Sequence, residues 1–167
     1  MIIDSTVEPV LPLLRAVGKI PSGIFVLTAG HGPEASAILV SFVQQISREP
    51  LCIGVAIQQT RAIGAIIEKN RGFTLNICHT GDRTLLRKYA RQALIGEQAF
   101  EGVKTRRAPN GATILLDACA WIWCDISRRV KFGGDHELLI GVAAAGDLLG
   151  DEQAKPMVHI RHDGSNY

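Results

Sequence analysis

Aromatic side chains and net charge are both scarce in this sequence. Aromatic residues make up 5% of the 167 residues, and the formal net charge is +2. A protein that stacks on nucleic-acid bases needs aromatic surface, and one that holds a polyanion needs an excess of positive charge. We therefore expect no nucleic-acid partner.

Long hydrophobic runs are also missing, although hydrophobic residues make up 47% of the chain. The apolar runs stop well short of a membrane span, and the hydrophobic content is too high for a disordered chain. The first residues, MIIDSTVEPVLPLL, lack the basic start and long apolar core of a signal peptide. We expect one folded domain over residues 1–167. We also expect the protein to be cytoplasmic and to have no membrane partner.

Cysteine is present without the spacing that binds metals. The four cysteines are Cys52, Cys78, Cys119 and Cys124, and all lie in apolar runs. None forms a CxxC pair or a Cys/His pair at zinc-ligand spacing. The pattern predicts reduced thiols packed in the core, and no metal site.

Apolar runs of strand length alternate with turn residues along the chain. Strands are predicted at residues 23–29, 35–43, 51–57, 73–78, 113–126 and 137–145. Helices are predicted at 9–17, at 62–70 with Thr60 as N-cap, and at 83–93 with Asp82 as cap. Residues 1–9 are predicted to form an arm, and residues 96–111 an irregular segment serving as a lid or a dimer contact. The fold class is α+β, mainly β: an antiparallel barrel of Greek-key type with peripheral helices, because an alternating parallel sheet would need a helix after every strand.

Residues 35–55 contain the most prominent candidate site. Two apolar strands are joined by a polar loop at residues 44–50, and the polar residues Ser41, Gln44, Gln45 and Ser47 gather at and beyond the end of the first strand. A polar cluster walled by apolar strands is typical of a small-molecule site. An ordinary solvated connection has the same composition, so this alternative stays open.

Two other places combine charge with a defined backbone position. Thr60 and Arg61 follow a strand and begin a helix, where first-turn amides and a guanidinium favour an anion. The alternative is a capped helix with a solvated arginine. His136 stands beside Asp135 after two glycines, at the entrance to a strand. This imidazole is either a functional group oriented by a carboxylate or a turn histidine bonded to backbone.

The strand predicted at residues 113–126 places Trp121 and Trp123 on one face and Ile122 and Cys124 on the other. Only one face of a barrel strand can point inward. The tryptophans must then be covered by a helix, by residues 96–111, or by a second subunit. Because paired tryptophans are favoured interface anchors, the pattern favours a homodimer.

Four motifs in order resemble the flavin reductase-like family of flavin-binding split barrels. They are IPSGIFVLTA (20–29), AILVSFVQQISREP (37–50), GFTLNIC (72–78) and GDHELLIG (134–141), and together they span nearly the whole chain. The form AILVSFVQQ is most similar to the flavin reductase domain at the C-terminal end of cyanobacterial diflavin proteins. Most members carry Thr where Leu39 stands, so a contact there must come from backbone amides.

The resemblance implies a homodimeric split barrel that holds FMN, or FAD, near the subunit interface. It implies an NAD(P)H:flavin oxidoreductase that passes electrons to free flavin, oxygen, a partner oxygenase or a redox protein. The open alternatives are a flavin-binding electron carrier without its own NAD(P)H turnover and a structural barrel that binds no flavin. The flavin phosphate is predicted to rest on Ser47, Thr60 and Arg61, and His136 with Asp135 is predicted to act in catalysis. The predicted cofactor-binding residues are Leu39, Val40, Ser41, Gln45, Ile46, Ser47, Thr60 and Arg61.

Overall fold

The computed structural model describes residues 10–91, 93–108 and 111–164. The chain divides into two compact units, residues 1–22 with 158–167, and Gly23–Met157. The smaller unit contains α1 (Val10–Val17) and β12 (Val158–His159), and β1 (Ser22–Gly23) lies at the boundary. The predicted first helix is thus present from residue 10, whereas the predicted arm at residues 1–9 lies outside the described residues.

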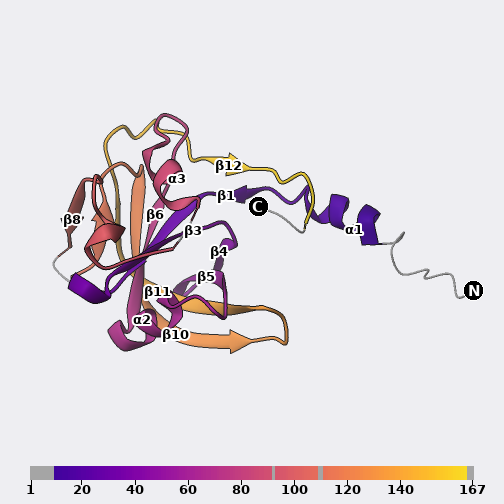
Figure 1. Cartoon of the computed structure of the whole chain (residues 1–167), viewed down its shortest axis with the longest axis horizontal. Coiled ribbons are helices and arrows are strands. Elements are labelled where there is room, and N and C mark those ends of the chain that lie inside the picture. Colours follow the sequence, from indigo (N-terminus) through magenta and orange to yellow (C-terminus); the bar gives the residue numbers. More distant parts are fainter. Residues whose placement is uncertain (1–9, 92, 109–110, 165–167) are drawn as a thin grey trace, which may run out of the picture. The chain divides into compact units, whose positions relative to one another are not determined.

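The larger unit is built on an antiparallel eight-stranded sheet with the strand order β4-β5-β11-β10-β6-β2-β3-β7 (Figure 1). A separate two-stranded sheet pairs β8 (Thr105–Arg107) with β9 (Thr113–Leu115). The helices are α2 (Ile63–Asn70) and α3 (Thr84–Tyr89), with short 3₁₀ turns at Gly32–Glu34 and Gly96–Ala99. The strands of the large sheet are β2 (Phe25–Ala29), β3 (Ser36–Val40), β4 (Val43–Arg48), β5 (Leu51–Gln58), β6 (Gly72–Ile77), β7 (Leu94–Ile95), β10 (Ala120–Lys131) and β11 (His136–Leu148). The mainly β fold with peripheral helices is confirmed.

The sheet curls into a barrel that strand pairing does not close. β4 forms one edge of the sheet and β3 lies near the other, yet only Ser41 and Phe42 separate them in sequence. The sheet must bend round until these strands approach each other, because so short a connection cannot cross a flat sheet of this width. We call Ser41 and Phe42 the seam. The architecture is a split barrel, as predicted.

Alternate residues of each strand fill the barrel. The main core cluster takes Leu27 and Ala29 from β2, Val55 from β5 and Phe73 from β6, and α2 adds Ile63 and Ile67. The other face of β2 and β3 packs on a second cluster that includes Leu85 and Tyr89 of α3. The period of two in the sequence therefore gives two apolar layers, one on each side of the sheet.

Gly141, the last residue of the GDHELLIG motif, is a packing residue. A Cβ atom at this position would lie 2.6 Å from Cβ of Cys124 and 2.8 Å from Cζ of Phe73. β11 can therefore pack this close to the ring of Phe73 only because residue 141 has no side chain. This part of the motif serves the core.

The four cysteines are free and buried, as predicted. Burial raises the pKa of Cys78 and of Cys124 to about 12. Both thiols are therefore protonated at neutral pH and behave as small apolar groups. None of the described helices is long and apolar enough to cross a membrane.

Three sequence predictions about the elements were wrong. Residues 44–50 are mostly strand, because β4 pairs with β5 in a hairpin instead of forming a loop. The strand predicted at 113–126 is broken between β9 and β10, where the amide of Ala118 donates to the carbonyl of Leu115 at 3.1 Å. Thr60 does not cap α2, whose N-cap is Ala62 without a side-chain hydrogen bond. At α3 the N-cap position is Arg83, and the predicted cap Asp82 stands one residue earlier, where its Oδ1 accepts from the amide of Thr84 at 2.7 Å.

Trp121 does not provide the free apolar face that favoured a dimer. Trp121 is buried and packs against Ala108, Ala112 and Ile114 of its own chain. Of the three covers that we considered, residues 96–111 contribute Ala108, and Ala112 and Ile114, just beyond that segment, contribute the rest. The tryptophan argument for a homodimer is therefore wrong for Trp121, and the oligomeric state has to be argued from other residues.

Candidate functional site

Two turns that carry predicted site residues lie side by side. The amide of Gln59 donates to the carbonyl of Asp135 at 3.0 Å, and its side-chain Nε2 donates to the carbonyls of Gly134 at 2.7 Å and His136 at 3.3 Å. In the sheet, His136 pairs with Gln58. Thr60 and Arg61 are thus held next to Asp135 and His136, although they are far apart in sequence.

His136 is oriented from both sides. Its Nδ1 lies 2.8 Å from Oδ1 of Asp135, and its ring centroid lies 5.6 Å from that of Phe42, at an interplanar angle of 59°. The hydrogen bond to His136 lowers the pKa of Asp135, so this carboxylate is ionised at neutral pH. An ionised carboxylate only accepts hydrogen bonds, so Nδ1 carries the proton. Nε2, the other ring nitrogen, is then the one left to contact a ligand beside the seam.

The seam itself contains a polar atom without a protein partner. Ser41 is buried, and its Oγ has no hydrogen-bond partner among the described residues. Val40 packs in the main core cluster and Leu39 against the second cluster. Of these predicted cofactor residues, Ser41 is the one that offers a polar side chain to a guest. Because their side chains pack in the core, Leu39 and Val40 could contact a ligand only through their backbone atoms.

β4 is an edge strand with an exposed polar stretch. Gln44, Gln45 and Ile46 are exposed, and the pairing with β5 shifts register between Gln45 and Ser47, which leaves Ile46 as the extra residue of a β-bulge. Gln45 Nε2 donates to the carbonyl of Ser47 at 3.3 Å. The bulge places the side chain of Ile46 against Gly54. A Cβ atom on residue 54 would lie 3.1 Å from Cγ2 of Ile46.

The predicted phosphate site divides into two separate places. Ser47 pairs with Cys52 near the start of β5, whereas Thr60 and Arg61 follow Gln58 at its end. The strand between Cys52 and Gln58 is about 20 Å long at ~3.3 Å per residue. One phosphate cannot reach both ends. The prediction that Ser47 shares a phosphate with Thr60 and Arg61 is therefore corrected, and Arg61 with Thr60 is the pair next to His136.

An ion-pair network fixes the turn of His136 to α2. Nη2 of Arg129 lies 2.6 Å from Oε1 of the buried Glu137, Nε lies 3.1 Å from Oε2, and Nη1 pairs with the exposed Glu68. Gly64 of α2 makes room for it, since a Cβ there would lie 3.1 Å from Oε1 of Glu137. The network therefore joins β10 and β11 to α2, the helix that follows Arg61.

Sequence reasoning missed the residues that hold this site together. Gln59 links the two turns, Phe42 stacks beside His136, and Arg129 with Glu137 anchors the strand entrance. The sequence offered one usable signal, a glutamate next to the candidate histidine in an otherwise apolar strand. A buried carboxylate needs a cation, but the sequence alone does not say which one.

The described residues form a split antiparallel barrel in which His136 is oriented by Asp135 and Phe42 beside the seam. The sequence matches the family described as "Flavin reductase like domain" over residues 17–165. The chain belongs to this family.

Relatives and solved structures agree with the assignment. The chain is 36% identical over 154 residues to putative diflavin flavoprotein A 3 of Nostoc sp., covering 92% of this chain and 26% of the relative. It is 33% identical over 156 residues to diflavin flavoprotein A 1 of Synechocystis sp., covering 93% and 27%. The chain thus spans about a quarter of the length of these relatives. The fold is that of the NADH:FAD oxidoreductase SgcE6 of Streptomyces globisporus, with a TM-score of 0.78, 21% identity, and coverage of 98% of this chain and 94% of that one.

Proposed function

We propose that this chain is a flavin-dependent oxidoreductase that binds FMN, or FAD, at the seam and accepts hydride from NAD(P)H. The observation that carries the proposal is the meeting of the Gly134–His136 turn with the turn of Gln59 to Arg61 beside the seam. Family membership and relatives named as diflavin flavoproteins support a flavin as the guest. One solved structure of the same fold is the SgcE6 oxidoreductase in complex with NAD and FAD fragments.

The donor set fits a flavin. Ser41 Oγ is buried without a partner in the described part of the chain, so it suits a polar edge of the ring system or the ribityl chain. Arg61 is exposed and takes part in none of the ion pairs found among the described residues, so its guanidinium is available to a phosphate. The start of α2 directly after Arg61 adds its positive dipole end.

The flavin, when bound, supplies the hydride chemistry, and the protein supplies position and protons. The Asp135 carboxylate keeps the proton of His136 on Nδ1, which leaves Nε2 to contact nicotinamide or to exchange a proton with the reduced cofactor. Phe42 fixes the ring of His136 against the seam. With flavin bound, the electrons would pass to free flavin, oxygen or a partner oxygenase. Solved structures of this fold include the flavin reductase components of a tryptophan halogenase and of a styrene monooxygenase.

The second candidate function is a flavin-binding electron carrier without its own NAD(P)H turnover. The length of the relatives favours it, because the chain spans about a quarter of each, and the rest of these diflavin flavoproteins lies outside the matched part. Mixing the flavin-loaded protein with NADH and with NADPH separates the two. Rapid bleaching of the flavin supports the reductase, and an unchanged spectrum supports the carrier.

Arg61→Ala is expected to weaken FMN binding about tenfold to a hundredfold, because one charge-assisted contact to the phosphate is lost. Arg48→Ala is the matched control, since Arg48 is also exposed but lies at the other end of β5. Fluorescence titration with FMN measures both dissociation constants. Equal constants for wild type and Arg61→Ala would remove Arg61 from the phosphate site.

We propose that the working unit is a homodimer. With Trp121 covered by its own chain, the support now comes from the edge hairpin of β4 and β5, where Ile46 and Leu51 are each 45% exposed. An edge strand with apolar side chains is a surface that proteins usually cover. Sedimentation at micromolar concentration should give twice the chain mass of 18.0 kDa. A monomer that binds FMN and oxidises NAD(P)H would refute it.

The buried free cysteines are consistent with a reducing compartment, which we propose to be the cytoplasm.

A further inference from the structure

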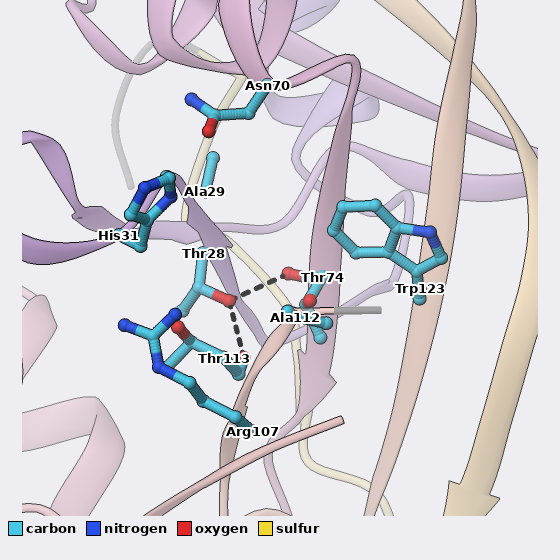
Figure 2. Close-up of a pocket in the computed structure, with 11 residues that line it drawn as sticks. Thr28, Ala29, His31, Asn70, Thr74, Arg107, Ala112, Thr113 and Trp123 are labelled. Atoms are coloured by element: carbon cyan, nitrogen blue, oxygen red, sulfur yellow. Dashed lines mark hydrogen bonds between the residues drawn. The ribbon is translucent and has the colours of Figure 1, made fainter. Parts of the chain in front are cut away.

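A cavity lies on the outer face of the barrel, away from the seam. Its volume is about 350 Å³, and it lies between β2, β6, β10 and the segment that leads into β9. Figure 2 shows His31, Asn70, Arg107 and Trp123 around it, with threonines on its floor. Its lining residues are Thr28, Ala29, Gly30, His31, Asn70, Thr74, Arg107, Gly111, Ala112, Thr113 and Trp123.

The floor contains a buried hydroxyl that no protein group satisfies. Thr74 is 0% exposed, and its Oγ1 has no hydrogen-bond partner among the described residues. The neighbouring Thr28 differs, because its Oγ1 donates to the carbonyl of Thr113 at 2.8 Å. A buried polar group without a partner costs free energy, so an unpaired hydroxyl lining a cavity indicates a guest that bonds to it.

The indole ring of Trp123 forms one wall of the cavity and is held in place. The indole Nε1 of Trp123 donates to Oδ1 of Asp125 at 3.1 Å, and the benzo edge lies over Gly72, where a Cβ would be 2.6 Å from Cζ2. In the sheet, Trp123 pairs with Thr74, and Thr74 pairs with Thr28. The ring is thus fixed next to the unpaired hydroxyl, which suits a flat guest.

The charge of the lining favours an anion. Arg107 lines the cavity from β8, and Figure 2 shows its guanidinium and the His31 ring on the same side, opposite Trp123. None of the described residues that line the cavity is acidic. A guanidinium presents its donors in a planar fork that matches a carboxylate.

From the stacking wall, the guanidinium and the unpaired hydroxyl, we infer that this cavity binds a small planar carboxylate of the size of benzoate. The ring stacks on Trp123, the carboxylate pairs with Arg107, and the hydroxyl of Thr74 bonds to the guest. This site is separate from the seam. Trp123 lies eight positions before Lys131, which pairs with Glu137 next to His136, and this length of strand is about 26 Å.

Calorimetric titration of the full chain with benzoate tests the inference. A dissociation constant on the order of 1 mM is expected for so small a ligand, with no binding of benzylamine, which has the opposite charge. Arg107→Gln should weaken benzoate binding about tenfold or more. Arg106→Gln, the neighbouring exposed arginine outside the lining, should leave it unchanged.

Thr74→Val separates binding from structure. Valine has nearly the same shape and removes the unpaired hydroxyl, so the variant should melt no lower than wild type while binding benzoate several-fold more weakly. Saturating FMN should not change the benzoate affinity. The inference is overturned if benzoate does not bind, if Arg106→Gln and Arg107→Gln weaken binding equally, if Thr74→Val binds as wild type does, or if FMN displaces benzoate.

Discussion

Replacing Arg129 with methionine is expected to lower the free energy of unfolding by about 3 to 5 kcal/mol. Arg129 is the guanidinium that pairs with Glu137, a carboxylate whose side chain is 2% exposed. Without it, the buried carboxylate of Glu137 loses the cation that compensates its burial. Urea denaturation followed by circular dichroism measures the change. A shift in the urea midpoint with an unchanged slope of the unfolding free energy against urea concentration reports a change in stability.

Glu68→Ala and a double variant make this prediction specific. Glu68 contacts the same guanidinium, but its side chain is 69% exposed, so its loss should cost no more than about 1 kcal/mol. Arg129→Met combined with Glu137→Leu removes both buried charges and should recover most of the lost stability. A double variant as unstable as Arg129→Met alone would show that the ion pair is not the cause.

His136→Ala is expected to slow flavin reduction by NAD(P)H on the order of 100-fold, the usual effect of losing a positioned proton-transfer group. FMN affinity should stay within a few-fold of wild type, since His136 lies on a different turn from the Arg61 guanidinium. Asp135→Asn should slow the same step less, because it keeps the imidazole but removes the carboxylate that fixes its tautomer.

His79→Ala provides the control for this experiment. His79 also lies in a turn, where its Nδ1 accepts from the amide of Gly81 at 3.2 Å, but it pairs with Pro156 and belongs to no part of the seam. Stopped-flow reduction should be unchanged in this variant. A His136→Ala protein that folds yet loses its flavin would place the histidine in cofactor retention instead of hydride transfer.

Periodicity in the sequence predicted the barrel well because core strands have strong signals. In the run 51–57 the residues Ile53, Val55 and Ile57 pack in the main core cluster, and in the run 73–78 Phe73 and Leu75 do the same. The edge strand β4 was predicted as a loop because its exposed Gln44 and Gln45 look the same in an edge strand as in a turn. The break after Leu115 was missed because that run has no glycine or proline.

The candidate site was predicted in parts, and pairing in the sheet decides how they combine. Each of Ser41, Arg61 and His136 stood out in its own stretch, but only the register shows that Arg61 lies beside His136 and that Ser47 lies at the far end of β5. The cavity at Thr74 was not predicted at all. Its residues are neighbours across β2, β6 and β10, and no local pattern in the sequence marks them.

Anaerobic stopped-flow mixing of the FMN-loaded protein with NADH and NADPH tests the central claim most directly. The account predicts rapid, complete bleaching of the flavin with at least one of the two nucleotides, and bleaching on the order of 100-fold slower in His136→Ala. Flavin that stays oxidised with both nucleotides, in a protein that holds FMN, would contradict the reductase. It would leave the electron carrier as the function of this fold.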